Sequence, residues 1–270
     1  MCGKRAVKQS RPDARSSACR YAGSKPNRTD PPSGAPVHSV STIDQLLAVL
    51  RPDSSPALIW YGPDGERVEL SGRVLDNWVA KTANLLSEEL DAEPGTVIRL
   101  AMPPHWRSVV WALAGWQTGA TLTVDAAGDD GGTEPDVVVS NELDRLGGGP
   151  AYQVAVAEGA LALGWPGALP EGVLDYAAEV RSYGDVFMGM GSAENSATAL
   201  EYDGGSLTFD ALLHREPVSR NILIPTKSDW FTTLTEAVAT WLGGGTVVLC
   251  HQSVHDTAKL VANERITEQL

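Results

Sequence analysis

Between residue 39 and residue 270, short apolar runs alternate with longer segments whose apolar residues recur every three or four positions. The short runs, such as 97–101, 121–124 and 136–140, have the length of buried strands, and the longer segments have the period of helices. Strand–helix–strand repeats imply parallel strands joined by right-handed crossovers. The pattern therefore predicts an α/β fold, a layered α/β/α domain with a mostly parallel sheet.

The predicted elements follow one another without internal repeats. Strands are expected at 57–61, 67–70, 97–101, 121–124, 136–140, 152–157, 197–202, 221–224 and 246–250. Helices are expected at 41–50, 71–90, 106–118, 173–180, 209–214, 229–242 and after 253. Gly62-Pro63-Asp64-Gly65 is typical of a β-hairpin turn. Ser71 and either Ser228 or Asp229 are expected to cap helices, and Ser253–Asp256 resembles a capping box.

Residues 1–38 differ in composition from the rest of the chain. They contain eight Lys/Arg and two acidic residues, a formal charge of +6, with many Ser, Pro and Gly. A segment with so few large apolar residues is expected to be a disordered basic tail, either dispensable or able to bind something anionic. Residues 39–270 form the predicted domain, with 13 basic and 32 acidic residues and a charge of −19. Phosphate backbones and anionic lipids would be repelled by this domain, so neither nucleic acid nor membrane is an expected partner.

Cysteine usage and hydropathy suggest a location. The chain has three cysteines, an odd and low number, and no CxxC motif. A disulfide framework is therefore not expected, and a cytoplasmic protein is the default. The longest apolar runs are far shorter than the roughly 20 residues of a membrane span.

Several residue constellations could carry chemistry, and each has a structural interpretation as well. The chain contains no GxxxxGK[ST] motif and no GxGxxG motif. Cys250, His251, His255 and Asp256 lie close in sequence but need not share a face, so a core cysteine and solvated histidines are favoured over a metal site. Ser206 follows two glycines and precedes His214 by eight residues, which is too common a pairing to predict a catalytic triad.

Tryptophan is unusually frequent, with eight residues against three phenylalanines. Trp78, Trp106 and Trp111 fall on or near apolar stripes, so they are expected to pack in the core and not to form a ligand platform.

The order of segments resembles the start of the adenylate-forming superfamily, which includes acyl-CoA synthetases, peptide-synthetase adenylation domains and luciferases. The resemblance spans about residues 41–270 and is strongest in four places. These are RVELSGRVLDNWVAKTANLLSEEL (67–90), EPGTVIRLAMP (93–103) with GWQTGA (115–120), NILIPTKSDWFTTLTEAVATWLGGGTVVLC (221–250) and LVANERIT (260–267). It implies the fold of the first half of that family's N-terminal domain.

The departures from the family pattern concern activity. Where the family carries a phosphate loop with glycines, Ser/Thr and a lysine, this chain has Asp203, Gly204, Gly205 and Ser206. The lysine is missing, and Asp203 places an anion where a triphosphate would sit. These four residues are the candidate cofactor-binding positions, as the remnant of a nucleotide loop. The family's adenine pocket, magnesium-binding acids and C-terminal domain would follow Thr267, so the resemblance assigns no catalytic or metal-binding residue here.

The resemblance and its departures together predict a degenerate relative, a pseudoenzyme that does not adenylate on its own. We expect it to act as a binding or interaction module, as a homodimer or with a protein partner, without a cofactor. The alternative is a ligase-like enzyme, or an enzyme half completed by a partner chain, that still binds ATP or AMP with magnesium, or an acyl substrate. That alternative needs a cation delivered to residues 203–206, and Arg215 and Arg220 are the nearest candidates.

Overall fold

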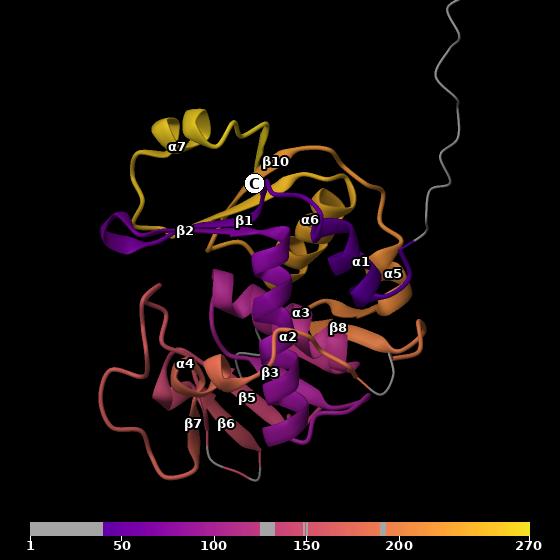
Figure 1. The fold of residues 1–270 in the computed structure, drawn as a ribbon, viewed down its shortest axis with the longest axis vertical. Coiled ribbons are helices and arrows are strands. Elements are labelled where there is room, and N and C mark those ends of the chain that lie inside the picture. The colour runs from indigo at the N-terminus through magenta and orange to yellow at the C-terminus, as the bar shows by residue number, and fades with distance from the viewer. Residues whose placement is uncertain (1–39, 125–132, 148, 150, 190–192) are drawn as a thin grey trace, which may run out of the picture. The chain divides into compact units, whose positions relative to one another are not determined.

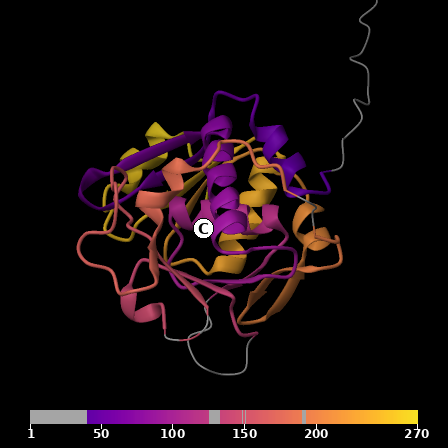
Figure 2. The ribbon, with the colours of Figure 1, turned by 60° about the horizontal axis from the view of Figure 1, so that its bottom comes forward.

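The computed structural model describes residues 40–124, 133–147, 149, 151–189 and 193–270. The tail predicted at 1–38 lies outside this part, as does most of the expected loop at 125–135. Two sheets organise the described residues (Figures 1 and 2). The smaller has the order β12-β10-β11-β1-β2, and the larger has the order β7-β6-β5-β3-β4-β8-β9.

Within each sheet the central pairings are parallel, and β1–β2 and β8–β9 are antiparallel. The strands of the five-stranded sheet are β1 (Pro56–Tyr61), β2 (Arg67–Ser71), β10 (Asn221–Pro225), β11 (Thr246–Cys250) and β12 (Glu268–Gln269). Those of the seven-stranded sheet are β3 (Val97–Leu100), β4 (Thr121–Val124), β5 (Val137–Ser140), β6 (Tyr152–Ala155), β7 (Val173–Asp175), β8 (Thr198–Tyr202) and β9 (Gly205–Thr208). The predicted α/β class with mostly parallel strands is confirmed, and the strands divide between two sheets where one was expected.

Helices pack against both sheets. They are α1 (Ile43–Leu50), α2 (Gly72–Glu89), α3 (Trp106–Thr118), α4 (Tyr176–Glu179), α5 (Phe209–Leu213), α6 (Trp230–Leu242) and α7 (Thr257–Asn263). Figure 1 shows α2, α3 and α6 between the two sheets and α7 on the outer side of the five-stranded sheet. Every residue of α3 is buried, so this helix forms the centre of the main core. In the described part of the chain, no helix combines the length and apolarity needed to cross a bilayer.

The capping predictions are mostly confirmed. Ser71 accepts a hydrogen bond from the Val74 amide, and Asp229 accepts one from the Thr232 amide. The capping box at Ser253 is wrong, because Asp256 caps α7 and Ser253 hydrogen-bonds to His251 instead. His255 therefore precedes the helix that was expected to contain it.

The helix predicted at 173–180 is shorter than expected. Val173–Asp175 pairs with β6 as strand β7, and only the residues from Tyr176 onward are helical. Asp175 ends the strand and caps α4, where its side chain accepts from the amides of Ala177 and Ala178. The open edge of β6 satisfies the backbone of Val173–Asp175, which local periodicity does not reveal.

Tryptophan side chains connect α6 to both sheets. Trp230, at the start of α6, donates its indole N–H to the Met102 carbonyl just after β3 at 3.1 Å. Trp241, near the end of α6, donates to the Ala57 carbonyl in β1 at 2.8 Å. Both side chains are buried, so each indole bond is made away from water, where an unpartnered N–H is costly. The prediction that tryptophans pack in the core is confirmed for Trp106 and Trp111, which are buried, and Trp78 packs against the same core.

We predict that Trp230→Phe and Trp241→Phe each lower the free energy of unfolding by about 1–3 kcal/mol, because each leaves a buried carbonyl without its donor and removes apolar contact. Urea unfolding of the full chain measures the effect. Trp165→Phe is the matched control, since Trp165 is half-buried and no indole hydrogen bond is found for it among the described residues. Equal losses in all three variants would contradict the assigned role of the indole bonds.

Candidate functional site

The four predicted nucleotide-loop residues form a tight β-hairpin. Only Asp203 and Gly204 lie between β8 and β9, because Gly205 and Ser206 pair with Tyr202 and Glu201 in the antiparallel ladder. Gly205 has a φ of +140°, a backbone conformation that favours glycine. All four residues are exposed. The open loop expected at 203–206 is therefore reduced to a two-residue turn with a carboxylate at its tip.

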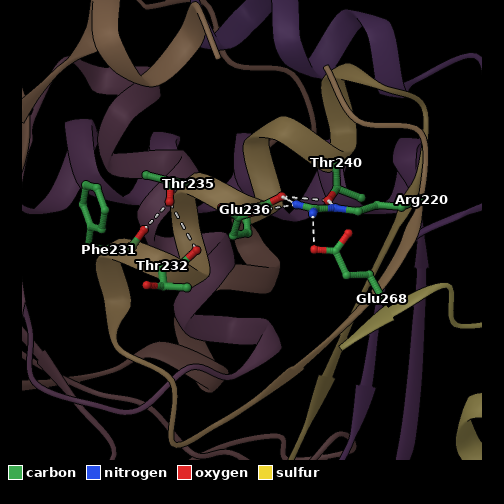
Figure 3. A network of polar contacts seen from close by, with 7 residues as sticks. All are labelled: Arg220, Phe231, Thr232, Thr235, Glu236, Thr240 and Glu268. Atoms are coloured by element: carbon green, nitrogen blue, oxygen red, sulfur yellow. Dashed lines mark hydrogen bonds and ion pairs between the residues drawn. The ribbon is translucent and has the colours of Figure 1, made fainter. Parts of the chain in front are cut away.

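Arg220, one of the two cations considered for that turn, is engaged elsewhere (Figure 3). Its guanidinium lies between Glu268, at 2.8 Å, and Glu236, and its Nε donates to Thr240 Oγ1 at 3.0 Å. Its side chain is 7% exposed. Although burial lowers the pKa of Arg220, hydrogen bonds to Glu236 and Glu268 raise it overall. Arg220 therefore fastens β12 and α6 to the start of β10, and its charge is balanced there.

A different set of polar residues gathers where strands of the seven-stranded sheet end. The chain passes from β3 to β4 on one side and then returns to place β5 on the other side of β3. Ligands of open α/β sheets commonly bind at such a switch point, beside the carboxyl ends of the strands. His105 follows β3, Asn141 follows β5 and Glu158 follows β6. Together with Glu66 and Arg107, these residues form what we call the strand-end cluster.

Arg107 is a buried cation with no carboxylate in ion-pair distance among the described residues. Its guanidinium carbon lies 4.3 Å from the Trp106 ring centre and 5.6 Å from that of Trp78, so cation–π contacts replace part of its hydration. Nη2 donates to the Gly159 carbonyl at 3.1 Å. Burial is the main cause of a lowered pKa for Arg107.

One peptide group connects Arg107 to the carboxylate of Glu66. The carbonyl of Gly159 accepts from Arg107, and the amide N–H of Ala160 donates to Glu66 Oε1 at 2.7 Å. The other oxygen of Glu66 accepts from the Trp60 indole at 2.8 Å. The peptide between Gly159 and Ala160 thus lies between cation and carboxylate, with its dipole aligned to both. This arrangement holds the loop after β6 against α3.

His105 caps α3 and is neutral at physiological pH. Its Nδ1 accepts from the Arg107 amide at 3.2 Å, so the proton of the neutral ring is on Nε2. The residue is 1% exposed and its ring packs edge-on against Trp60. Burial, with smaller contributions from Arg107 and His251, lowers the pKa of His105 to about 3. At neutral pH His105 is therefore a hydrogen-bond donor through Nε2, not an acid.

Glu158 is the most exposed residue of the cluster, and Glu66 and Asn141 are half-buried. Desolvation by the surrounding protein raises the pKa of Glu158, while a hydrogen bond from Asn141 and the charge of His251 favour its ionised form. Glu158 therefore lies where the cluster meets the molecular surface.

The cluster is rich in donors that lack acceptors. Arg107 Nε and Nη1, His105 Nε2 and Trp106 Nε1 are buried and have no partner among the described residues. All four belong to three successive residues at the N-terminus of α3, the positive end of a thirteen-residue helix. Buried donors require acceptor atoms, so the arrangement has the chemistry to hold an acceptor-rich group.

The remaining sequence candidates do not assemble into sites. Among the residues with described placement, no group of three His, Cys, Asp or Glu side chains could hold a metal ion. His251 is hydrogen-bonded to Ser253 at 2.8 Å. His214 lies 3.1 Å from Asp210 on its own helix turn, and Ser206 is exposed in β9.

Comparison with solved structures identifies the fold. Brucella canis acyl-CoA synthetase matches with a TM-score of 0.64 and 19% identity over 84% of this chain and 49% of that one. The N-terminal subdomain of Klebsiella oxytoca NpsA matches with a TM-score of 0.60 and 12% identity over 88% and 62%. The chain has the fold of the N-terminal subdomain of adenylate-forming enzymes. Acetoacetyl-CoA synthetase from Streptomyces lividans shares it, with a TM-score of 0.60 and 16% identity over 83% of this chain and 41% of that one.

Sequence comparison adds one curated relative. A protein of Mycobacterium tuberculosis H37Rv is 37% identical over 150 residues, which cover 52% of this chain and 59% of the relative. Its name gives a family and no activity. No family model matches the chain. This chain thus spans well under two thirds of the relative and about half of the synthetase with the adenylate-forming fold. The expected family fold is confirmed, and the comparisons leave residues 203–206 untested as a nucleotide site.

Sequence reasoning missed the strand-end cluster. A signal was present, because His105, Asn141 and Glu158 each come shortly after a short buried strand. Parallel strands bring such residues to one edge of a sheet. The signal is weak without the strand order, which places β5 next to β3 and not next to β4.

We predict that His105 makes the fold sensitive to acid. The unfolded chain takes up a proton at His105 below about pH 6.5, whereas the folded chain does so only near pH 3. Its contribution to stability is therefore complete above about pH 6.5 and is lost as the pH falls towards 3. Between about pH 6 and pH 4, the free energy of unfolding should fall by up to about 1.4 kcal/mol per pH unit more steeply than in His105→Asn.

The Asn variant keeps a side chain that can cap α3. His214→Asn, at the exposed end of α5, is the control and should keep the wild-type slope. Urea unfolding at a series of pH values measures both. The same slope in wild type and His105→Asn would show that His105 is not buried in the neutral form.

Proposed function

We propose that this chain is a non-adenylating relative of adenylate-forming enzymes that works as a binding or interaction module. The observation that carries the proposal is the two-residue turn between β8 and β9. It stands where the family resemblance places the phosphate loop. Asp203 and Gly204 are all that connects the two strands.

The physical argument concerns charge and space at this turn. Binding and transfer of a phosphoryl group require converging N–H donors and a cation. The segment Thr198–His214 contains no lysine or arginine, and its turn carries the carboxylate of Asp203. Gly205 and Ser206 already belong to a sheet ladder. A triphosphate at this place would meet repulsion and few donors.

The strand-end cluster supports the binding part of the proposal. Its unpartnered donors follow β3, at the N-terminus of α3, whereas the altered turn lies at the end of β8. The β8–β9 turn and the strand-end cluster lie on different strands, so a change at the turn leaves the cluster intact. A ligand held there would be bound through acceptor atoms and not through a phosphate loop.

The alternative, a surviving ATP- or acyl-binding enzyme or an enzyme half completed by a second chain, requires a cation at the turn. Arg220 is held between Glu236 and Glu268. Arg215, half-buried after α5, is then the nearest arginine for that role. A nucleotide affinity that disappears in Arg215→Ala would favour this alternative.

We predict that the full chain gives no saturable heat with Mg-ATP or AMP in calorimetric titration and releases no pyrophosphate with carboxylic acids. Asp203→Asn should behave identically, because removing the anion does not rebuild the loop. Glu216→Gln, an exposed charge change outside the turn, is the matched control. Saturable Mg-ATP binding that Asp203→Asn strengthens and Glu216→Gln leaves unchanged would overturn the proposal.

The expected partner and location remain predictions of the same proposal. A homodimer or a complex with another protein is expected, and light scattering of the full chain tests the first. A well-folded monomer at high concentration would contradict the homodimer. We place the protein in the cytoplasm, as its cysteine usage indicates.

A further inference from the structure

One short segment covers Arg107 of the strand-end cluster. Residues 159–164 lead from the end of β6 to Trp165, whose amide N–H donates to Asp175 Oδ2 at 2.7 Å. None of these six residues is buried. Arg107, in contrast, is 0% exposed, and its Nη2 donates to the carbonyl of Gly159. The guanidinium therefore lies directly beneath an exposed peptide group.

Two further charged side chains hold this segment, and both bind its main chain. Glu66, from the β1–β2 hairpin, accepts from the amide N–H of Ala160 at 2.7 Å. Arg181, in the turn after α4, donates to the carbonyl of Ala162 at 2.8 Å. Together with Arg107, the charged side chains come from three different elements. The position of the segment thus depends on hydrogen bonds that can be removed one at a time.

Apolar packing adds little to the closed position of the segment. Leu161 is 90% exposed and Leu163 is 75% exposed, so the two large apolar side chains of the segment face water. Apolar side chains stabilise a conformation by being removed from water, and these two are not removed from it. Segments with few buried apolar contacts have the lowest free energies of local opening. We therefore expect residues 159–164 to open while the two sheets stay folded.

The hydrogen bonds of Arg107 do not favour the closed position strongly. The Gly159 carbonyl accepts from Nη2 alone, and Nε and Nη1 have no acceptor among the described residues. A group with two acceptor oxygens can bind two nitrogens of a guanidinium at once. Arg107 therefore gains hydrogen bonds when a ligand of that kind takes the place of the Gly159 carbonyl.

We propose that residues 159–164 are a lid on the strand-end cluster, and that the lid opens by local unfolding and so gives a ligand access to Arg107. The proposal rests on the binding role proposed above for the cluster and adds the route by which the site is reached. Arg181 offers the cleanest test, because it is exposed and contacts the lid from outside. Its removal leaves Glu66 and Arg107 in place.

Hydrogen exchange of the full chain, followed by NMR, tests whether the lid opens. The amides of Ala160 and Ala162 are hydrogen-bonded in the closed lid. We expect both to exchange at least about tenfold faster than the Val110 amide in the middle of α3, a helix whose residues are all buried. Arg181→Ala should accelerate both lid amides by about three- to tenfold, because one hydrogen bond to the lid is lost, and should leave Val110 unchanged.

Arg145→Ala is the matched control, since Arg145 is an exposed arginine outside the lid. It should leave the exchange of the lid amides and of Val110 unchanged. Circular dichroism checks the fold of each variant.

Access to Arg107 is measured with phenylglyoxal, a reagent that modifies arginine side chains, followed by mass spectrometry of the chain modified in its folded state. We expect Arg107 to be modified more slowly than Arg265, which is exposed. In Arg181→Ala the modification of Arg107 should accelerate by the same factor as the exchange of the lid amides, whereas that of Arg265 should not change.

Two results would contradict the lid. Lid amides that exchange no faster than the Val110 amide would show that residues 159–164 open only with the whole fold. Modification of Arg107 that begins only when urea unfolds the chain would show that its guanidinium is not reached in the folded protein. Neither measurement uses a nucleotide or another ligand. A lid that stays closed is therefore distinguishable from a failure of the proposed function, which calorimetry would reveal as Mg-ATP binding.

Discussion

The two indole hydrogen bonds of α6 join the two sheets, and the positions of the other central elements depend on them. Trp230 bonds to the segment after β3 and Trp241 bonds to β1, so one helix is fixed to both sheets through its two ends. Each donor is buried and each acceptor is a main-chain carbonyl. A phenylalanine could fill much of the same space but could not fix the register of the helix against either sheet.

The same constraint brings together the residues of the strand-end cluster. Trp60 and Glu66 come from the β1–β2 hairpin of one sheet, while His105 and Arg107 follow β3 of the other. Their contacts exist only because the sheets are held face to face across α3 and α6. Arg107 is thereby buried without an adjacent carboxylate. The Gly159–Ala160 peptide accepts a hydrogen bond from Arg107 and donates one to Glu66. Buried titratable groups with perturbed pKa values cluster at functional sites.

Local pattern was enough to predict most elements of the fold, and it failed where long-range pairing decides. Apolar periodicity predicted α1, α2, α3 and α6, and the missing lysine at 203–206 was visible directly. Val173–Asp175 was assigned to a helix because its pairing partner, β6, is twenty residues distant in sequence. Arg107 lies in the helix expected at 106–118 and His105 just before it, and the local pattern assigned neither residue a role. Their burial and unpartnered donors arise from Trp60, Trp78 and the loop after β6, which no local pattern connects to them.

The β8–β9 turn and the donor-rich environment at the start of α3 belong to different parts of the fold. The segment after β8 is a two-residue turn that carries a carboxylate. The donor-rich environment at the start of α3 depends on β3, β5, β6 and the sheet–sheet contact. Substitutions at residues 203–206 alter exposed positions, whereas substitutions at the start of α3 disturb buried residues. The proposed loss of phosphate binding at the turn is therefore compatible with retention of the fold and its interior polar cluster, as the proposed binding function requires.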